Sequence, residues 1–518
     1  MTAPGGNPSL KWIVALTTML GTFMEVLDTS VANVALPHMK GSFAAGTDEI
    51  TWVITSYLVA NAIILPITGW LGAAFGRRRL YLLCLAIFTL ASFGAGAAPS
   101  LGFLILMRVV QGLSGGAMVP MSQAITLEAF PKEEQGMASA LFGIGVIFGP
   151  IVGPLVGGWI TDHWTWPWIF WINLPVGALA YALAYAFVED PDYLRPPEGR
   201  ADLWSLGFIA VGLGCLEIFL NRGERLDWLA SNPMKVAAGL AALGLTLFVW
   251  RSLTAARPLV DLRLFRLPEF ASGMAIIFLV SFGLYGAFVL MPLFVQSLLG
   301  FTPTWAGMIL SPGGIASILA MVAVALLMKR VDARVFVAAG VASMAYSAWL
   351  LTRLSLATDL SYLVVAWIFH GIGIGFIFVP VATVAVRRIP PESMGVASGL
   401  FNLMRNEGGS VGIAVATTLL SQRVQFHHAR LAEHLAATSG PAQEAFARLG
   451  QGLFPRAGLD PVSVKGLAAG LIGAEVTRQS AVLSFVDAFA FLAVVFLVAL
   501  PFVLALKSPN GGGGFVLH

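Results

Sequence analysis

Blocks of about twenty consecutive, mostly apolar residues recur along the whole chain and alternate with short polar stretches. A helix of this length crosses the roughly 30 Å hydrocarbon layer of a membrane. Hydrophobic residues make up 58% of the sequence and charged residues 11%, against about 25% charged residues in a soluble domain. A soluble core cannot bury so much apolar surface. We therefore expect an all-α polytopic membrane protein whose main solvent is membrane lipid.

Hydropathy over windows of about 19 residues predicts about fourteen transmembrane helices. They lie near residues 12–36, 49–70, 80–98, 102–125, 136–160, 167–188, 203–221, 235–253, 270–293, 305–327, 334–352, 361–384, 395–419 and 482–505. An even number of spans places both termini on one side of the membrane. Most arginines and lysines of the short loops, including Arg77, Arg78 and Arg79, lie on that side. The positive-inside rule therefore predicts that both termini are cytoplasmic.

Charge and cysteine content exclude several classes of function. The net charge of +3 lies mainly in short loops, where it sets topology, so we expect no nucleic-acid partner. Cys84 and Cys215 lie inside apolar blocks and offer neither metal-ligand spacing nor a disulfide framework. His427, His428 and His434, in the loop before the last span, leave surface metal binding as a weak alternative. We expect no metal site and no bound cofactor.

Two segments interrupt the alternation of spans and short loops. Residues 189–202 are charged and proline-rich, which is typical of a cytoplasmic linker. Residues 422–480 are too long for an ordinary connection, and the span count places them on the extracytoplasmic side. Apolar and charged residues recur at helical spacing near 424–437 and 462–478, so we expect short amphipathic helices there. The glycine-rich tail, residues 509–518, is expected to be disordered.

Ionisable residues inside the spans are the first candidates for function. Glu25 and Asp28 share one face of the first span, and Arg108 in the fourth span is their expected partner. A charge at the bilayer centre costs roughly 2.5–3.5 kcal/mol, so such residues normally face a cavity or a partner. A guanidinium favours an ionised carboxylate and an apolar cavity favours a neutral one, which is what a proton carrier requires. The alternative is that these residues only tie helices together.

The fifth span and the loop after the second span contain glycine-rich patterns. In the fifth span a glycine recurs every four residues with prolines between: Gly145, Gly149, Pro150, Gly153, Pro154 and Gly157. Small residues allow close helix approach and prolines permit bending, which favours a surface that rocks during a conformational cycle over packing alone. The loop of residues 69–79 ends in Arg77, Arg78 and Arg79 and either anchors topology or acts in gating.

Other polar residues in the spans are candidates for a substrate cavity. They are Gln111, Glu217, His370, Arg405, Glu407 and Asp487. Arg405 shares a face with Gly409 and Gly412, whereas Glu407 points elsewhere, toward another helix. A structural role remains open for Glu217, His370 and Asp487.

Five motifs in the expected order resemble those of the fourteen-span drug:proton antiporters of the major facilitator superfamily. Residues 27–37, LDTSVANVALP, resemble the first-span signature of that family. Residues 69–79, 108–116 and 149–158 resemble the superfamily's loop, proton-coupling and antiporter motifs, and residues 166–177 resemble the entry to its sixth span. The similarity is greatest to inner-membrane subunits of Emr-type multidrug export systems. Gly72, Ala73 and Ala74 stand where the loop motif usually has an acidic residue, which weakens any charge relay there.

The resemblance implies a fold, a mechanism and partners. It implies a six-helix bundle over residues 1–190, a linker with two inserted transmembrane helices over 191–265, and a second bundle over 266–508 that includes the loop 421–481. It implies alternating access in a bacterial inner membrane, with inward protons exchanged for outward hydrophobic small molecules and no cofactor besides the proton gradient. Asp28, Arg108 and Glu25 would couple protons, and residues 77–79 would gate. A periplasmic adaptor and an outer-membrane channel would complete a tripartite pump.

A nutrient symporter and a membrane-embedded enzyme are the alternatives to an exporter. A proton-coupled nutrient symporter would carry a denser set of fixed polar groups and no glycine- and proline-rich antiporter helix. A membrane-embedded enzyme would need a nucleophile with its base, or a metal cluster, within the spans. The long loop is expected to cap the transporter or dock an adaptor through apolar anchors, the alternative being a solvated appendage. The expected anchors are Phe426, Leu431, Phe446, Leu449 and Leu453.

Overall fold

A computed structural model of the chain describes residues 9–191, 202–255, 258–433, 444, 448 and 461–506. Every regular element within these residues is a helix. Most of the expected linker, the middle of the long loop and the expected disordered tail lie outside them. The prediction of two bundles joined by two inserted helices is not tested by the arrangement of the helices alone and stays a prediction.

The first nine α-helices, with the 3-10 helix η1, occupy residues 10–187. They are α1 (Leu10–Ser42), α2 (Thr47–Ile50), α3 (Trp52–Ile64), η1 (Leu65–Ile67), α4 (Thr68–Phe75), α5 (Arg77–Gly96), α6 (Leu101–Ala129), α7 (Gln135–His163), α8 (Trp168–Trp171) and α9 (Asn173–Phe187). The second expected span is therefore α3, η1 and α4 in sequence, because Pro66 interrupts the regular backbone hydrogen bonding between α3 and α4.

The remaining helices follow the linker. They are α10 (Leu203–Arg222), α11 (Asn232–Thr254), α12 (Pro268–Ser297), α13 (Pro303–Leu327), α14 (Ala333–Leu351), α15 (Leu360–Val386), α16 (Met394–Glu433), α18 (Pro461–Val498) and α19 (Leu500–Ala505). The 3-10 helix η3 (Glu224–Leu226) follows α10, and η6 (Pro391–Ser393) precedes α16.

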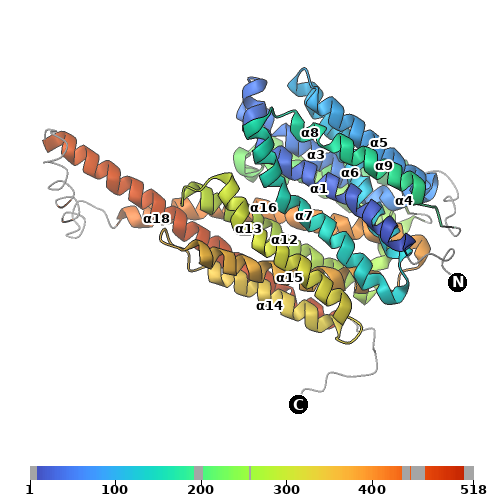
Figure 1. The fold of residues 1–518 in the computed structure, drawn as a ribbon. Coiled ribbons are helices and arrows are strands. Elements are labelled where there is room, and N and C mark those ends of the chain that lie inside the picture. The colour runs from blue at the N-terminus through green and yellow to red at the C-terminus, as the bar shows by residue number, and fades with distance from the viewer. Residues whose placement is uncertain are drawn as a thin grey trace, which may run out of the picture.

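Within the described residues, thirteen helical segments are long and apolar enough to cross a membrane. α16 is not among them because Arg405, Asn406 and Glu407 interrupt its apolar sequence. It nevertheless packs against α12 and α18 inside the bundle, as the other spans do (Figure 1), so we count it as the fourteenth. The prediction of an all-α polytopic membrane fold is confirmed.

Polar contacts show which helix ends share one end of the bundle. Lys11 forms an ion pair with Glu134 of the α6–α7 connection, and Arg334 donates to the carbonyl of Leu506. The described ends of the chain therefore both lie at the end that carries the α6–α7 connection and the start of α14. α16 and α18 project beyond the bundle at the opposite end (Figure 1).

The expected short amphipathic helices of the long loop are wrong for the described residues. Residues 424–433 continue α16, a helix of 40 residues, and residues 461–478 belong to α18, a helix of 38 residues. Neither residues 417–433 nor residues 474–498 contain glycine or proline, so nothing stops the backbone hydrogen-bond ladder where the apolar sequence ends. Hydropathy locates the limit of the lipid-facing segment rather than the limit of the helix.

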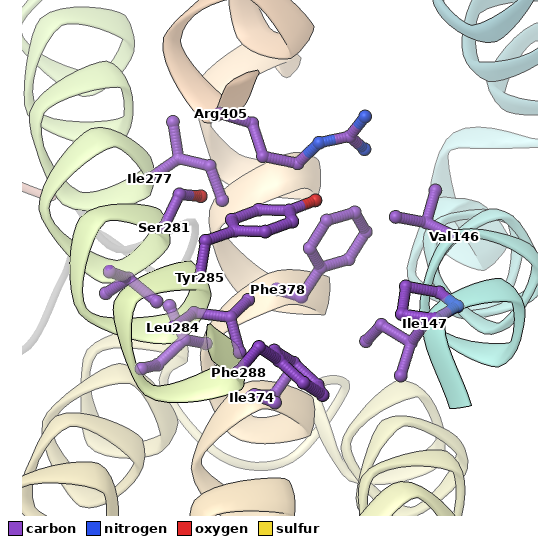
Figure 2. Close-up of a pocket in the computed structure, with 13 residues that line it drawn as sticks. Val146, Ile147, Ile277, Ser281, Leu284, Tyr285, Phe288, Ile374, Phe378 and Arg405 are labelled. Carbon is purple, nitrogen blue, oxygen red and sulfur yellow. The ribbon is translucent and has the colours of Figure 1, made fainter. Parts of the chain in front are cut away.

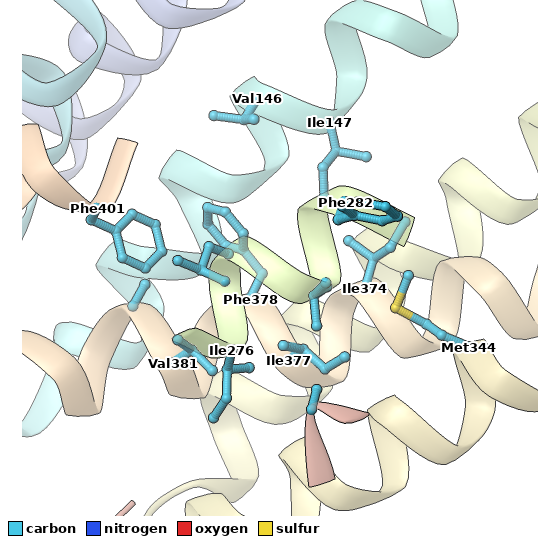
Figure 3. Close-up of a cluster of buried hydrophobic side chains, with 14 of the residues drawn as sticks. Val146, Ile147, Ile276, Phe282, Met344, Ile374, Ile377, Phe378, Val381 and Phe401 are labelled. Carbon is cyan, nitrogen blue, oxygen red and sulfur yellow. The ribbon is translucent and has the colours of Figure 1, made fainter. Parts of the chain in front are cut away.

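Helices α1–α9 are called the first half of the molecule and helices α12–α19 the second half. Buried apolar side chains join α7 to the helices of the second half. One cluster contains Val146 and Ile147 of α7, Phe282 of α12, and Ile374 and Phe378 of α15 (Figure 3). Two smaller clusters lie among the helices of the first half. Because α7 also packs against α1, it is shared between the two parts of the molecule.

Candidate functional site

Asp28 lies at the centre of a buried polar network in the first half. Its carboxylate forms an ion pair with Arg108, and both side chains are 0% exposed. The second carboxylate oxygen, Oδ1, accepts hydrogen bonds from Asn173 Nδ2 at 2.7 Å and Gln111 Nε2 at 3.2 Å. Helices α1, α6 and α9 thus meet at one carboxylate. The expected contact between Asp28 and Arg108 is present, and the role of the pair in proton coupling stays a prediction.

The Arg108 guanidinium is held by further contacts. Its Nε donates to the Val53 carbonyl at 3.1 Å, and its Nη1 also donates to Gln111 Oε1 at 3.0 Å. The guanidinium carbon lies 4.1 Å from the centre of the Tyr57 ring, in the geometry of a cation–π interaction. Gln111, expected in a substrate cavity, instead links Asp28 to Arg108.

Glu25 has partners of its own. Its Oε1 accepts hydrogen bonds from the Tyr57 hydroxyl at 2.7 Å and from Asn61 Nδ2 at 3.0 Å. Asn61 Oδ1 accepts from Asn406 Nδ2 at 3.2 Å, and Arg405 donates to Asn406 Oδ1 at 3.3 Å. A chain of polar contacts therefore runs from α1 through α3 to α16. Arg405 is also an electrostatic neighbour of Glu25.

One pocket lies between α7 and the helices α12, α15 and α16. Its space, part of which is open to solvent, amounts to about 520 Å³, and its walls are almost wholly apolar. Arg405 is the one charged side chain among the described residues that line it, and Ser281 and Tyr285 supply hydroxyl groups. Figure 2 shows Arg405 on the same side as Tyr285, with Val146 and Ile147 of α7 on the other. Arg405 Nη1 has no hydrogen-bond partner among the described residues.

The structure does not bring the six expected cavity residues together. Only Arg405 lines the pocket. His370 is 1% exposed and stacks on Trp367, with ring centroids 4.6 Å apart. Asp487 accepts from Arg423 at 2.5 Å and contacts His427 at 2.7 Å where α16 and α18 leave the bundle. The spacing of residues predicts which of them share a face of one helix. It does not predict which other helix packs against that face.

Glu217 and Glu407 meet away from the pocket. Glu217 of α10 is 2% exposed and Glu407 of α16 is 5% exposed, and the two carboxylates are electrostatic neighbours. Glu407 does point toward another helix, as its spacing from Arg405 indicates. Within the described residues, no group of three or more His, Cys, Asp or Glu side chains could hold a metal ion.

The three arginines expected to gate have different surroundings. Arg77 is buried, forms an ion pair with Glu128, and donates from Nη2 to the Pro391 carbonyl at 3.4 Å. Arg78 bonds to Asp190 through its backbone and to a carbonyl of α9 through its guanidinium, and Arg79 is exposed. Among the hydrogen bonds between described residues, Arg77 is the one of these three arginines that reaches the second half of the molecule.

The glycines of α7 lie against α1. A methyl group built at Gly149 would lie 2.7 Å from Val26 Cγ1, and one at Gly153 would lie 2.2 Å from Ser30 Oγ. Gly145 and Gly157 are similarly close to Met19 and Val31. Small residues are required here because the backbones approach closely. Pro150 faces away from this contact and lines the pocket, whereas Pro154 is part of neither described contact.

Several residues of the site were missed in the sequence. Asn173, Tyr57 and Asn61 are the donors that complete the Asp28 and Glu25 networks, and Glu128 is the partner of Arg77. The one available signal was that amide side chains are rare in otherwise apolar spans, where an unpaired polar group is costly.

Comparisons with known proteins agree with this architecture. Residues 18–413 match the model of the Major Facilitator Superfamily. The chain is 33% identical over 516 residues to the fatty acid resistance protein FarB of Neisseria gonorrhoeae, covering 99% of each chain. It is 33% identical over 506 residues to the multidrug export protein EmrB of Escherichia coli (strain K12), covering 97% of this chain and 96% of that protein.

Solved structures share the fold at low sequence identity. The human organic anion transporter MFSD10 has a TM-score of 0.61 at 15% identity, covering 96% of this chain and 100% of that one. The proton:xylose symporter XylE has a TM-score of 0.61 at 13% identity, covering 97% of both chains. The family match extends over most of the chain and the relatives over nearly all of it. This chain is therefore a transporter, not an enzyme, and belongs to the Major Facilitator Superfamily.

Proposed function

We propose that this chain is a proton-coupled multidrug efflux antiporter of a bacterial inner membrane, with both termini in the cytoplasm. The names of its relatives, a fatty acid resistance protein and a multidrug export protein, support export of hydrophobic small molecules. The arginine-rich loops lie at the end where the described chain begins and ends, which supports a cytoplasmic location for that end. The observation that carries the proposal is the fully buried pair of Asp28 and Arg108.

A proton on Asp28 changes the balance of this network. The ionised carboxylate neutralises the buried guanidinium of Arg108, and protonation leaves that guanidinium without its counter-charge. An unpaired buried charge is costly, so Arg108 must find water or another partner. Because Arg108 also contacts the Val53 carbonyl of α3, its movement shifts α6 relative to α3. This is the step that would link proton entry to conformational change.

The pocket suits hydrophobic substrates. Apolar walls discriminate weakly between shapes, which agrees with export of varied molecules. Arg405 offers one unsatisfied donor within those walls, so an acidic group on a substrate would find a partner there. The chain of contacts from Arg405 through Asn406 and Asn61 to Glu25 connects this pocket to the first half.

In this conformation the two halves touch at the proposed cytoplasmic end. Asn402 donates to Gln123 at 2.7 Å, and Ser139 and Thr383 lie 3.0 Å apart. Gly69 lies so close to the second half that an added methyl group would come within 2.4 Å of the Val396 nitrogen. Alternating access requires these contacts to separate so that substrate can enter from the cytoplasm.

Replacing Asp28 with asparagine tests the proposal. Asparagine keeps the size and hydrogen-bonding shape of the side chain but cannot take up a proton, so Asp28→Asn should abolish pH-driven accumulation. The measurement is uptake of a panel of dyes and weak acids into inverted vesicles with an imposed pH gradient. Substrate binding and expression should persist. Wild-type accumulation by this variant would contradict the proposed coupling, and accumulation of nutrients in the opposite direction would favour a symporter.

We further propose that the projecting parts of α16 and α18 dock a periplasmic adaptor, which would connect to an outer-membrane channel. These helix ends extend beyond the bundle on the proposed periplasmic side (Figure 1). Phe426, Leu467 and Leu471 are exposed large apolar residues on them. Apolar anchors within a polar surface are typical of protein interfaces. Of the other expected anchors, Leu431 is half-buried, whereas Phe446, Leu449 and Leu453 lie outside the described residues.

Replacing Leu467 and Leu471 together with serine tests the docking surface. The two leucines lie four residues apart on one face of α18, so replacing them with serine removes exposed apolar area without breaking the helix. Vesicle transport should be unchanged, while co-purification of the adaptor and drug resistance of whole cells should fall. Ala469→Ser, at an exposed position between them, is the matched control. Unchanged adaptor binding by the double variant would remove this surface from the proposal.

A further inference from the structure

A pair of buried carboxylates lies where α10 contacts α16. Glu217 of α10 and Glu407 of α16 are 2% and 5% exposed. The pair is separate from Asp28 and Arg108 and does not line the pocket described above. Nothing in the proposed coupling step uses either residue.

The two carboxylates differ in their partners. Glu217 Oε1 accepts from Ser410 Oγ at 2.8 Å, and its Oε2 accepts from Asn221 Nδ2 at 2.7 Å. Ser410 lies three residues after Glu407 on the same helix, so both side chains are on the face of α16 that meets α10. Neither oxygen of Glu407 has a hydrogen-bond partner among the described residues. Glu407 therefore lies buried beside another carboxylate with nothing donating to it.

Among the described residues, the surrounding helices place no cation in contact with Glu407. The ionisable residues of the helices packed around the pair include Tyr57, Arg108, Cys215, Tyr285, His370, Arg405 and Asp487. Arg108 is paired with Asp28, and Arg405 contacts Asn406 and faces the pocket. At the end of α10 nearer the pair, Arg222 and Arg225 lie at Asp48, and at its other end Arg251 pairs with Asp202. The charged neighbour of Glu407 is Glu217.

We propose that Glu217 and Glu407 hold a proton between them and form a second proton-binding site of the transporter, built jointly by α10 and α16. Two negative charges buried together without a cation are strongly unfavourable, and one proton removes that repulsion. Ser410 and Asn221 stabilise the ionised form of Glu217, so the proton resides on Glu407. The use of this site in transport rests on the proposed proton coupling, whereas its protonation does not.

The site has a short path to water. Asn221, which donates to Glu217, is exposed at the last turn of α10. This turn lies beside Asp48, at the end of the bundle opposite the described chain ends. A proton from water at the exposed Asn221, on the proposed periplasmic side, would have to cross only one helical turn to reach the pair. Because α10 packs against both α3 and α16, loading or emptying the site changes how α10 holds the second half.

Infrared spectroscopy tests the site without requiring transport. The full-length protein in lipid is titrated from mildly acidic to alkaline pH, and the C=O stretching band of protonated carboxylic acids is followed. Wild type should show a titrating band that is lost in Glu407→Gln, and altered in Glu217→Gln. Asp28→Asn should retain that band, as should Glu224→Gln, which changes an exposed acid at the same end of the bundle.

Two results would overturn the proposal. One is an identical band in wild type and Glu407→Gln. The other is suppression of the band by sodium or potassium at fixed pH, which would show that an alkali cation occupies the site. In proteoliposomes, Glu407→Gln should also move fewer protons per substrate than wild type, and an unchanged ratio would remove the site from the transport cycle. If Asp28→Asn exports normally while the Glu407 band is present, the Asp28 step fails and this site stands.

Discussion

The two halves of the molecule surround their buried charges in opposite ways. Among helices α1 to α9, the Asp28 carboxylate has a guanidinium and two amide donors. Among helices α12 to α18, Arg405 lines an apolar pocket, and its Nη1 has no hydrogen-bond partner among the described residues. The charges of Asp28 and Arg108 balance each other until a proton binds to the carboxylate. The unsatisfied donor of Arg405 instead favours binding of a substrate that carries a hydrogen-bond acceptor. Within the proposed function, the first half responds to protons and the second binds substrate.

Polar contacts connect the Asp28 network of the first half to the Arg405 pocket of the second half. Asn61 contacts Glu25 in the first half and Asn406 in the second, and Asn406 in turn contacts Arg405. A substrate anion that draws Arg405 away from Asn406 would loosen this chain at one end. Protonation at the first half would loosen it at the other. The same few side chains can therefore transmit occupancy in both directions.

The largest effect is expected from Arg108→Ala, which breaks the balanced network. Removing one partner of a buried ion pair costs about 3–5 kcal/mol because the other charge remains buried. The variant should lose pH-driven export and denature at lower temperature in detergent. Arg108→Lys, which keeps the charge but not the fork of donors, should recover stability more than coupling. If Arg108→Ala and Arg108→Lys both transport like wild type, the pair has no part in coupling.

A smaller and more selective effect is expected from Arg405→Ala in the pocket. A hydrogen bond to a charged group contributes about 1.5–3 kcal/mol, which is roughly tenfold or more in affinity. Binding of an acidic dye should weaken by about that factor, while binding of a neutral dye of similar size changes little. Arg405→Lys should retain most of the preference for the acidic dye. Equal losses for both dyes would show that Arg405 shapes the pocket without recognising charge.

The fold was largely predictable because the membrane fixes helix length. The expected spans at 80–98, 203–221 and 334–352 agree with α5, α10 and α14 to within three residues at each end. The thickness of the bilayer sets the number of apolar residues in each span, and hydropathy detects those residues directly. Hydropathy did not predict the ends of α16 and α18, because a helix can continue beyond the lipid-facing sequence, as α18 does through Gly466 and Gly470.

The site was only partly predictable. Asp28 and Arg108 could be paired because charges in apolar spans need partners and few partners exist. Asn173 and Tyr57 could not be assigned, since neutral donors gave no comparable signal in one sequence. The separation of Glu407 from the pocket, and its meeting with Glu217, depend on how α10 lies against α16.

The smallest effect is expected at Asp202, where an ion pair like that of Asp28 lies at the membrane edge. Asp202 accepts from Arg251 Nε at 2.7 Å, and Arg251 is 35% exposed, unlike the fully buried Arg108. The hydrogen bond from Arg251 lowers the pKa of the Asp202 carboxyl below its ordinary value. A lowered folded-state pKa contributes stability at neutral pH that is lost as the pH falls through that pKa.

Two substitutions separate the charge of Asp202 from its role as the N-cap of α10, where it accepts from the Ser205 backbone at 3.3 Å. Asp202→Asn keeps a good N-cap and removes the charge, so its small loss of thermal stability at neutral pH should vanish in acid. Asp202→Ala also loses the cap, worth about 1 kcal/mol, and should remain destabilised in acid. Neither variant should alter pH-driven export. A loss of export comparable to that of Arg108→Ala would mean that burial does not distinguish the two ion pairs.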